Sequence, residues 1–361
     1  MEKIKNIEFL RIIGIVAIIM LHLFQKRLPN LYPDIEIYNQ LHTMTCNGQK
    51  AVDLFFILSG FFFALKLNLQ QSLWVFVKNK LIRFYPVMIF VVICSSFLSF
   101  KLYNYMMCLL FLTGTPLVLN AGGIAINPLW YLSSLLWSLV LYFYLLKNYK
   151  KKSVNLIIAI IAIFSYALII QELNGGINSH TKIINGFINI GMLRALGGIG
   201  IGYFIAEWYK LNIDKIKNFS CNFLQKLLFS LIEFACLFFI INNLILHKLK
   251  YPNQMIFIII FIFTIILFLL KKGFISKILD NNLCPIISKY TFSLYMTHVL
   301  GLENVKKHLW KTHHEWVYAI PIENIVYTLL LVFILGIFTY HFVEKPCAEY
   351  FKRIEKQKRT T

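Results

Sequence analysis

The sequence has little charge and lacks the common fingerprints of soluble enzymes. Only 14% of its 361 residues are charged, whereas 58% are hydrophobic, and this balance is too apolar for a soluble globular protein of this size. It contains no Rossmann glycine motif, no P-loop and no GxSxG motif. No polar segment is long enough to form a second, soluble domain. The composition therefore predicts an integral membrane protein.

The cysteine pattern argues against disulfides and a metal site, and the charge pattern argues against nucleic-acid binding. The seven cysteines are scattered, with no CxxC pair and no histidine at metal-ligand spacing, so neither a disulfide framework nor a metal site is predicted. The net charge of +20 comes from short basic clusters between apolar runs, which positive-inside topology explains better than nucleic-acid binding. We expect no bound metal, no permanently bound cofactor and no nucleic-acid partner.

Ten apolar runs are long enough to cross a bilayer. A weaker run at 103–119 is interrupted by Gly114 and Pro116, and we interpret it as re-entrant or interfacial. No small-residue cleavage site follows the first run, so it is an uncleaved span. The predicted fold class is an all-α polytopic transmembrane helical bundle, and residues 1–361 are expected to form a single integral membrane domain. The ten runs lie near residues 8–24, 51–68, 82–100, 128–146, 153–171, 184–208, 226–246, 254–270, 285–302 and 317–343.

The basic clusters predict the orientation of the chain. If 103–119 does not cross the bilayer, these clusters fall on the cytoplasmic side, as the positive-inside rule requires. Both termini are then cytoplasmic, and the protein is a multi-pass protein of the inner (cytoplasmic) membrane. Lys248, Lys250, Lys306, Lys307 and Lys311 fall in outer loops and depart from the rule. The clusters are Lys3 with Lys5, Lys78–Arg83, Lys147–Lys152, Lys210–Lys217, Lys271–Lys277 and Lys352–Arg359.

The first apolar run carries three ionisable residues, Glu8, Arg11 and His22, among aliphatic neighbours. Such groups are costly inside a membrane and so indicate function. Arg11 and His22 are eleven residues apart, which places them on one helix face about 16 Å apart. Glu8 precedes Arg11 by three residues and can neutralise it. The alternative to a functional role is that Glu8 and Arg11 anchor the helix at the membrane interface and His22 lies among the lipid headgroups.

Charged residues also lie at the ends of the second and third spans. Asp53 lies at the outer end of the second span, and the small pair Ser59-Gly60 lies at its mid-depth, where small residues allow close helix packing. Lys80 and Arg83 are three residues apart at the inner start of the third span. They can share a face and bind phosphates, or they can act as ordinary cytoplasmic anchors.

Aromatic and titratable residues mark the later spans. Trp130 and Tyr131 can stack on a sugar or belong to an aromatic belt. Arg194 lies inside an apolar run and needs a partner or water, whereas the glycines that follow it permit close packing. His298 lies at a depth similar to that of His22, so the two can share a site, although a structural hydrogen-bonded role for His298 stays open.

Five motifs in order resemble those of the acyltransferase 3 family of membrane-bound acyltransferases. They are the arginine and histidine of the first helix, the VDLFFILSGF stretch, the basic pair before Tyr85-Pro86, the LWYLS stretch at 129–133, and the YTFSLYMTH stretch at 290–298, with a closing Glu344-x-Pro346 element interpreted as a structural clasp. The chain has Lys80 where the family commonly has arginine, and it has Ser133, Ser134 and Leu135 where many members have a glutamate. No periplasmic hydrolase-like domain is expected.

The resemblance implies that an acyl group moves from acyl-CoA to a hydroxyl of a cell-surface or lipid-linked carbohydrate. The usual case is acetyl-CoA with lipopolysaccharide, capsule or exopolysaccharide as the acceptor. Basic residues at the inner membrane surface, Arg11, Lys80 and Arg83, then hold the CoA phosphates. A neutral imidazole removes the hydroxyl proton, unless a transient acyl-histidine forms instead. The implied catalytic residues are His22 and Arg11, the donor-binding residues are Lys80 and Arg83, and the acceptor-binding residues are Asp53, Trp130, Tyr131 and His298.

Two other function classes fit the composition. In a polytopic glycan exporter or secondary transporter, the same charged groups would line a permeation path, and such proteins often contain inverted repeats. No internal repeat is apparent. A non-catalytic subunit of a polysaccharide synthase complex would have no indispensable polar residue. Transfer from labelled acetyl-CoA by the purified protein separates these classes from an enzyme.

Overall fold

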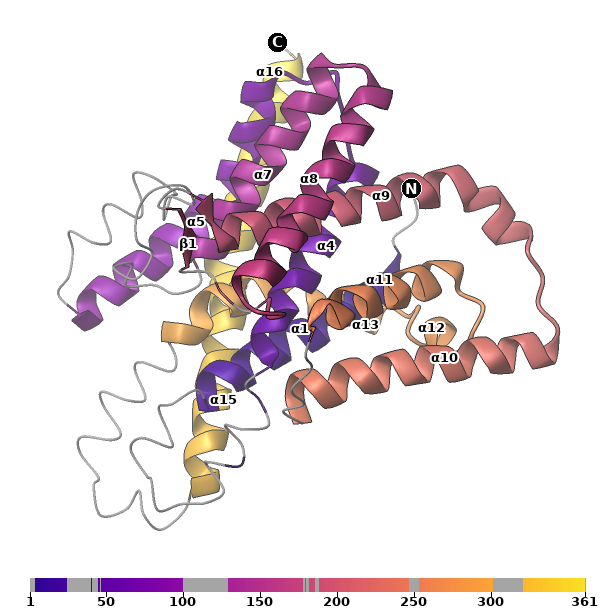
Figure 1. The fold of residues 1–361 in the computed structure, drawn as a ribbon. Coiled ribbons are helices and arrows are strands. Elements are labelled where there is room, and N and C mark those ends of the chain that lie inside the picture. The colour runs from indigo at the N-terminus through magenta and orange to yellow at the C-terminus, as the bar shows by residue number, and fades with distance from the viewer. Residues whose placement is uncertain are drawn as a thin grey trace. The chain divides into compact units, whose positions relative to one another are not determined.

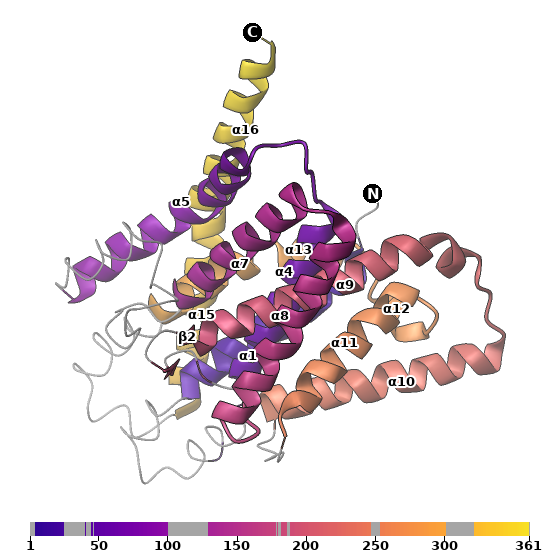
Figure 2. The same cartoon turned by 45° about the horizontal axis from the view of Figure 1, so that its top comes forward.

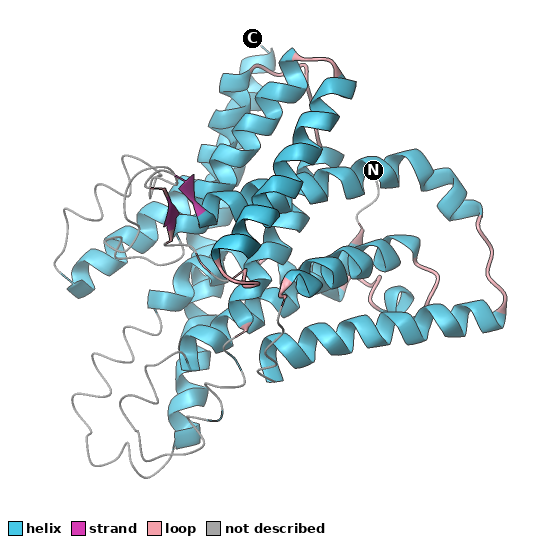
Figure 3. Cartoon of the chain, in the orientation of Figure 1, coloured by secondary structure: helices cyan, strands magenta, loops and turns pink. Residues whose placement is uncertain are grey.

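The computed structural model describes most of the chain, and nearly all of the described residues are helical (Figure 3). Besides loops and turns, these residues include one short antiparallel hairpin of β1 (Ile183–Ile184) and β2 (Ile188–Asn189). The predicted all-α fold class is confirmed. The run at 103–119 lies outside the described residues, which are 4–24, 40, 45, 47–99, 129–177, 179, 182–185, 188–246, 253–300 and 321–360.

Seven helical segments of the described chain are long and apolar enough to cross a membrane, so the protein is a multi-pass membrane protein. By internal packing the chain groups into two compact units, unit 1 (Met1–Gln70 and Trp137–Lys289) and unit 2 (Gln71–Leu136 and Tyr290–Thr361). The helices are α1 (Lys5–Phe24), η1 (Gly48–Lys50), α4 (Ala51–Leu65), α5 (Leu73–Ser99), α7 (Leu129–Asn148), α8 (Lys151–Glu172), α9 (Ile190–Asn218), α10 (Phe223–Ile241), η3 (Asn242–Leu246), α11 (Met255–Leu270), α12 (Phe274–Ile278), α13 (Leu283–Ser288), α15 (Pro321–Thr339), η4 (Tyr340–Glu344) and α16 (Lys345–Thr360).

Several predicted spans have different boundaries in the structure. The helix of the run at 82–100 begins at Leu73, so Lys80 and Arg83 lie within α5 rather than at its start. The run at 184–208 begins in the hairpin, and its helix starts at Ile190 because the Asn189 side chain caps it by accepting from the Met192 N–H. The run at 285–302 is not one helix. It turns at residues 289–290, between α13 and a second helix at 291–300, and this turn coincides with the boundary between the two units.

Glycines allow α4 and α9 to pack with their backbones in contact in unit 1. A Cβ added to Gly60 would lie 2.2 Å from the Ile199 carbonyl oxygen, and one added to Gly202 would lie 2.0 Å from the Ile57 carbonyl oxygen. No larger residue fits either position without moving a helix. The predicted packing roles of Gly60 and of the glycine run after Arg194 are confirmed.

Helix α1 runs antiparallel to α4. A Cβ on Gly48, just before α4, would lie 2.4 Å from the Ala17 carbonyl oxygen near the end of α1. At the opposite end of α4, the Phe62 ring lies 4.6 Å from the Arg11 guanidinium carbon near the start of α1. Gly14 faces the Phe55 ring between these contacts. The end of α1 that carries His22 therefore meets the start of α4.

Basic residues gather at the other end of unit 1. The Lys210 ammonium donates to the Ala64 carbonyl at 2.6 Å and pairs with Glu207 at 2.8 Å. Lys151, at the start of α8, also pairs with Glu207, and Lys147 donates to a carbonyl just after α4. Two of the basic clusters predicted to share a membrane face therefore lie together.

Helices α10 and α11 lie side by side and complete unit 1 (Figures 1 and 2). The Asn6 side-chain amide donates to the Phe268 carbonyl at 2.7 Å and so ties the start of α1 to the end of α11. Glu233 of α10 is fully buried, and its Oε2 accepts the Ser276 N–H of α12 at 3.0 Å. This carboxylate therefore caps the short helix α12 from a neighbouring helix.

Unit 2 packs α5, α15 and η4 around the helix at 291–300. A Cβ on Gly336 would lie 2.4 Å from a Leu294 methyl group, and the rings of Phe84 and Phe292 have centroids 5.9 Å apart. These contacts join the third predicted span to the last one. The helix that carries His298 is therefore held by neighbours on two sides.

Candidate functional site

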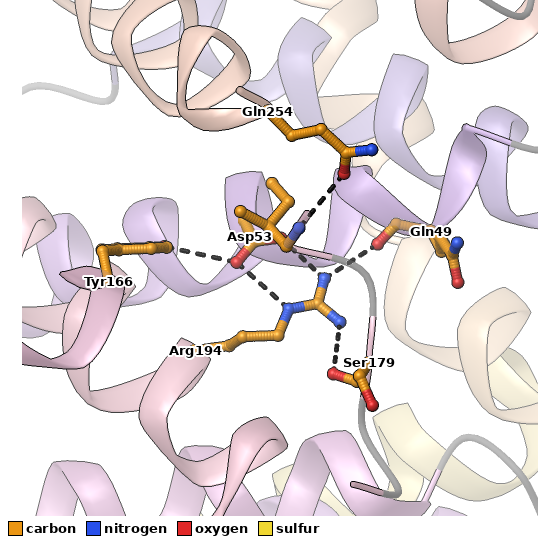
Figure 4. A network of polar contacts seen from close by, with 7 residues as sticks. Gln49, Asp53, Tyr166, Ser179, Arg194 and Gln254 are labelled. Carbon is orange, nitrogen blue, oxygen red and sulfur yellow. Dashed lines mark hydrogen bonds and ion pairs between the residues drawn. The ribbon is translucent and has the colours of Figure 1, made fainter. Parts of the chain in front are cut away.

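Asp53, in the first turn of α4, forms a buried ion pair with Arg194 of α9 (Figure 4). Nη2 of the arginine lies 2.6 Å from Oδ2 of the aspartate, and Nε lies 3.2 Å from Oδ1. The contact is therefore bidentate. The exposed fractions of the side chains are 1% for Arg194 and 0% for Asp53. Arg194 thus has the partner that its place in an apolar run requires.

Backbone carbonyls and one hydroxyl complete this network. Nη1 of Arg194 donates to the Ser179 carbonyl at 3.2 Å, and Nη2 donates to the Gln49 carbonyl at 3.0 Å. The Tyr166 hydroxyl of α8 donates to Oδ1 of Asp53 at 3.2 Å. Each nitrogen of the guanidinium therefore has an acceptor within the protein. The network joins η1, α4, α8 and α9.

The sequence indicated part of this network. Asp53 and Arg194 are opposite charges in apolar runs, so their pairing could have been predicted from the cost of isolated charges in a membrane. Tyr166 carried no such signal, since it is one of 19 tyrosines in a hydrophobic chain. The direct contacts of Asp53 are with the protein, and acceptor binding by this residue stays a prediction.

Arg11 is less enclosed than Arg194. Its Nη1 lies 3.2 Å from Oε2 of Glu8, which also accepts the Ser288 hydroxyl at 2.9 Å. One face of the guanidinium covers the Phe62 ring, and the side chain keeps an exposed fraction of 25%. The predicted neutralisation of Arg11 by Glu8 is confirmed.

His22 lies half-buried in the last turn of α1. The helix is continuous from Lys5 to Phe24, so Arg11 and His22 project from one side of it, as their spacing predicts. The neighbouring residue Leu21 faces Gly48 of η1, where an added Cβ would lie 3.0 Å from the Leu21 Cβ. The end of α1 that carries His22 therefore lies against η1, the turn just before α4.

Lys50 is a buried cation near this end of unit 1 that the sequence pattern did not indicate. Its exposed fraction is 1%, its ammonium donates to the Asn47 side chain, and it lies 4.4 Å from the centroid of the Phe257 ring. An ammonium over an aromatic face is a stabilising arrangement. The sequence signal was weak because Lys50 adjoins a polar loop.

Three of the predicted acceptor-binding residues come together in unit 2. The ring centroids of Trp130 and Tyr131 are 6.5 Å apart, those of Tyr131 and Tyr295 are 5.2 Å apart, and those of Tyr295 and His298 are 5.9 Å apart. Nδ1 of His298 lies 2.7 Å from the Tyr295 carbonyl. That nitrogen must donate to the carbonyl oxygen, so in the neutral imidazole Nε2 is the acceptor.

The two predicted donor-binding residues lie on α5 near η4. The Lys80 ammonium lies 5.1 Å from the Phe76 ring centroid, and Arg83 is exposed. The Glu344 carboxylate of η4 accepts the Ser293 hydroxyl at 2.6 Å. Glu344 therefore holds η4 to the helix at 291–300, and its pairing with a nearby basic group stays a prediction.

The predicted site residues fall into two sets. Arg11, His22 and Asp53 belong to unit 1, and the others belong to unit 2. Within each unit the residues lie as described above, and a site shared by His22 and His298 stays a prediction. No cluster of three metal-ligating His, Cys, Asp or Glu side chains occurs among the described residues.

The chain matches a known protein family. The model of the acyltransferase 3 family, described as an acyltransferase domain, matches residues 4–342. No curated protein and no solved structure matches. The family match covers all eight predicted site residues and runs through both units.

Proposed function

Because this chain belongs to the acyltransferase 3 family, we propose that it is an O-acetyltransferase that moves the acetyl group of acetyl-CoA to a hydroxyl of a cell-surface or lipid-linked carbohydrate. Lipopolysaccharide, capsule or exopolysaccharide supplies the acceptor. The protein works in the inner membrane with both termini in the cytoplasm. The observation that supports this proposal most directly is the first helix, where Arg11 and His22 share one side of an otherwise apolar span.

His22 is the general base of the proposed reaction. A neutral imidazole nitrogen takes the proton of the acceptor hydroxyl while the hydroxyl oxygen attacks the thioester carbonyl. The new ester bond forms as the carbon–sulfur bond breaks, and CoA leaves as the thiolate, which takes up a proton. Formation of an acyl-histidine at His22 before transfer is the other route with the same overall balance.

Lys80 and Arg83 bind the phosphates of the donor. Arg83 is exposed, and guanidinium and ammonium groups are the usual protein ligands for phosphate. Two cations three residues apart on α5 can share the phosphates of CoA.

The aromatic cluster of Trp130, Tyr131 and His298 binds the acceptor. Aromatic faces pack well on the apolar faces of sugar rings, and the ring contacts through Tyr295 hold Tyr131 and His298 in one group. The Nε2 acceptor of His298 suits a sugar hydroxyl, which is a hydrogen-bond donor.

Transfer by purified protein tests the proposal. The full chain in nanodiscs is incubated with acetyl-CoA labelled in the acetyl group, with and without a lipid-linked glycan fraction. We expect label in the glycan from wild type and none from His22→Ala or His22→Gln, because neither replacement can accept the proton. Both variants should insert and melt as wild type does.

Three results would contradict the proposal. No label in the glycan with wild type would favour an exporter or a non-catalytic subunit. Near wild-type transfer by His22→Ala would remove His22 from the mechanism and leave His298 as the next candidate. Unchanged acetyl-CoA affinity after replacing both Lys80 and Arg83 by alanine would remove those residues from donor binding.

A further inference from the structure

We propose that Asp53, Arg194 and Tyr166 act as positioning residues that hold the η1 turn against the end of α1 that carries His22. We call these three residues the clamp. The proposal rests on the proposed function, because it assigns the clamp a part in the chemistry at His22. It also gives Asp53 a role that differs from direct acceptor binding.

The first link runs from the clamp to η1. Nη2 of Arg194 donates to the Gln49 carbonyl at 3.0 Å while the same nitrogen contacts Oδ2 of Asp53 at 2.6 Å. A hydrogen bond from a charged donor is stronger than one between neutral groups, and the arginine that donates this one is itself buried. The position of the Gln49 backbone is therefore set by the guanidinium.

The second link runs from η1 to α1. Gly48, the residue before Gln49, lies so close to α1 that an added Cβ would be 2.4 Å from the Ala17 carbonyl oxygen and 3.0 Å from the Leu21 Cβ. His22 follows Leu21 directly in the helix. With no space between the two backbones, a shift of η1 must move this part of α1 or open a gap there.

The third link is the support of the clamp itself. Asp53 is part of α4, and α4 packs on α9 through backbone contacts at Gly60 and Gly202. The Tyr166 hydroxyl adds a bond from α8 at 3.2 Å. A buried ion pair is weak evidence for added stability, because desolvation offsets much of its attraction. Its bidentate geometry does fix the orientation of both side chains, and this suits a positioning role.

The mildest change to the clamp gives the cleanest test. Tyr166→Phe removes one hydroxyl and leaves the ion pair in place, so the variant should fold. Tyr142→Phe is the matched control, because the Tyr142 side chain is buried and its hydroxyl donates to the Leu196 carbonyl of α9 at 2.7 Å rather than to a residue of the clamp. Both variants are studied as full chains in nanodiscs.

Two readouts separate positioning from general stability. The first is the rate at which diethyl pyrocarbonate modifies His22, measured by mass spectrometry of its peptide. The second is kcat and KM for acetyl-CoA. We expect Tyr166→Phe to raise the modification rate by up to about fivefold, the factor that corresponds to one lost hydrogen bond, and to lower kcat by a similar factor with KM unchanged. Tyr142→Phe should change neither.

The outcomes distinguish this inference from the proposed function. An unchanged modification rate in Tyr166→Phe, or an equal change in Tyr142→Phe, overturns the clamp. A raised rate with wild-type kcat also overturns it as a positioning device for transfer. If wild type transfers no acetyl group, the proposed function fails, and the modification rates still report whether the clamp controls the surroundings of His22.

Discussion

Two arginines in apolar helices of unit 1 have very different surroundings. Arg194 is 1% exposed, and each of its guanidinium nitrogens donates to a protein acceptor. Arg11 is 25% exposed, pairs with Glu8 three residues away, and lies on the Phe62 ring. Both are charges in a hydrophobic chain, which is the signal for function in a membrane protein. The comparison shows that burial and the number of acceptors separate a charge that holds the fold from one that can still meet a ligand.

The largest effect that tests this comparison is expected from Asp53→Asn. This change keeps the shape of the side chain but leaves the buried Arg194 charge without its counter-ion, which costs about 3–5 kcal/mol in comparable buried pairs. We expect a large loss of folded protein in membranes and a lower melting temperature of the remainder in detergent.

The control for Asp53→Asn is Asp280→Asn. Asp280 pairs with Lys271 at 2.6 Å, but the two side chains are 26% and 32% exposed. A pair that keeps this much contact with solvent contributes only about 0–1 kcal/mol, so this variant should melt close to wild type. Equal melting temperatures for Asp53→Asn and Asp280→Asn would show that burial does not distinguish the two pairs.

The next effect concerns the packing of α4 on α9, the helix that carries Arg194, and Gly202→Ala tests it. The new methyl carbon would lie 2.0 Å from the Ile57 carbonyl oxygen, so α4 and α9 must separate. We expect a loss of about 1–3 kcal/mol, as is typical of overpacked cores, measured as a lower melting temperature in detergent.

The neighbouring Gly200→Ala is the control for that prediction. Its added carbon would meet side chains, the nearest being the Ala162 Cβ at 3.1 Å, and side chains can adjust where a backbone cannot. The loss should be smaller. If Gly200→Ala is the more damaging variant, the backbone contact between α4 and α9 does not limit the packing.

The comparison also shows how far the sequence could predict this protein. The bounds of α1 and the start of α4 followed from apolar runs, and the Glu8–Arg11 pair followed from a spacing of three residues within one helix. The Asp53–Arg194 pair joins residues that are 141 positions apart. Membrane helices that are apolar all round carry little periodic signal for which neighbours they meet.

Local polar contacts account for the remaining differences. The break at residues 289–290 interrupts an apolar run that hydropathy reads as continuous. There the Ser288 hydroxyl donates to Glu8 of α1, a contact between residues 280 positions apart. The hairpin before α9 was missed because its four paired residues lie at the edge of an apolar run. Hydropathy reports burial in lipid and does not register such individual hydrogen bonds.

The smallest effect on stability is expected from Arg11→Lys, and it sharpens the comparison most directly. Lysine keeps the charge that pairs with Glu8 in a half-buried contact. The free energy of unfolding should therefore change by no more than about 1 kcal/mol, with a correspondingly small change in melting temperature. Lysine loses the planar fork. If Arg11 serves the donor, the KM for acetyl-CoA should therefore rise severalfold while transfer continues.

Arg194→Lys is the matched variant, since the same exchange at the buried position removes the bidentate contact with Asp53 and donors to two carbonyls. It should melt well below wild type, whereas Arg11→Lys should not. If the two exchanges lower the melting temperature equally, Arg11 belongs to the fold in the same way as Arg194, and its exposed fraction is no guide to function. If Arg11→Lys leaves both stability and the KM for acetyl-CoA unchanged, the charge alone at this position suffices, and the fork of Arg11 takes no part in donor recognition.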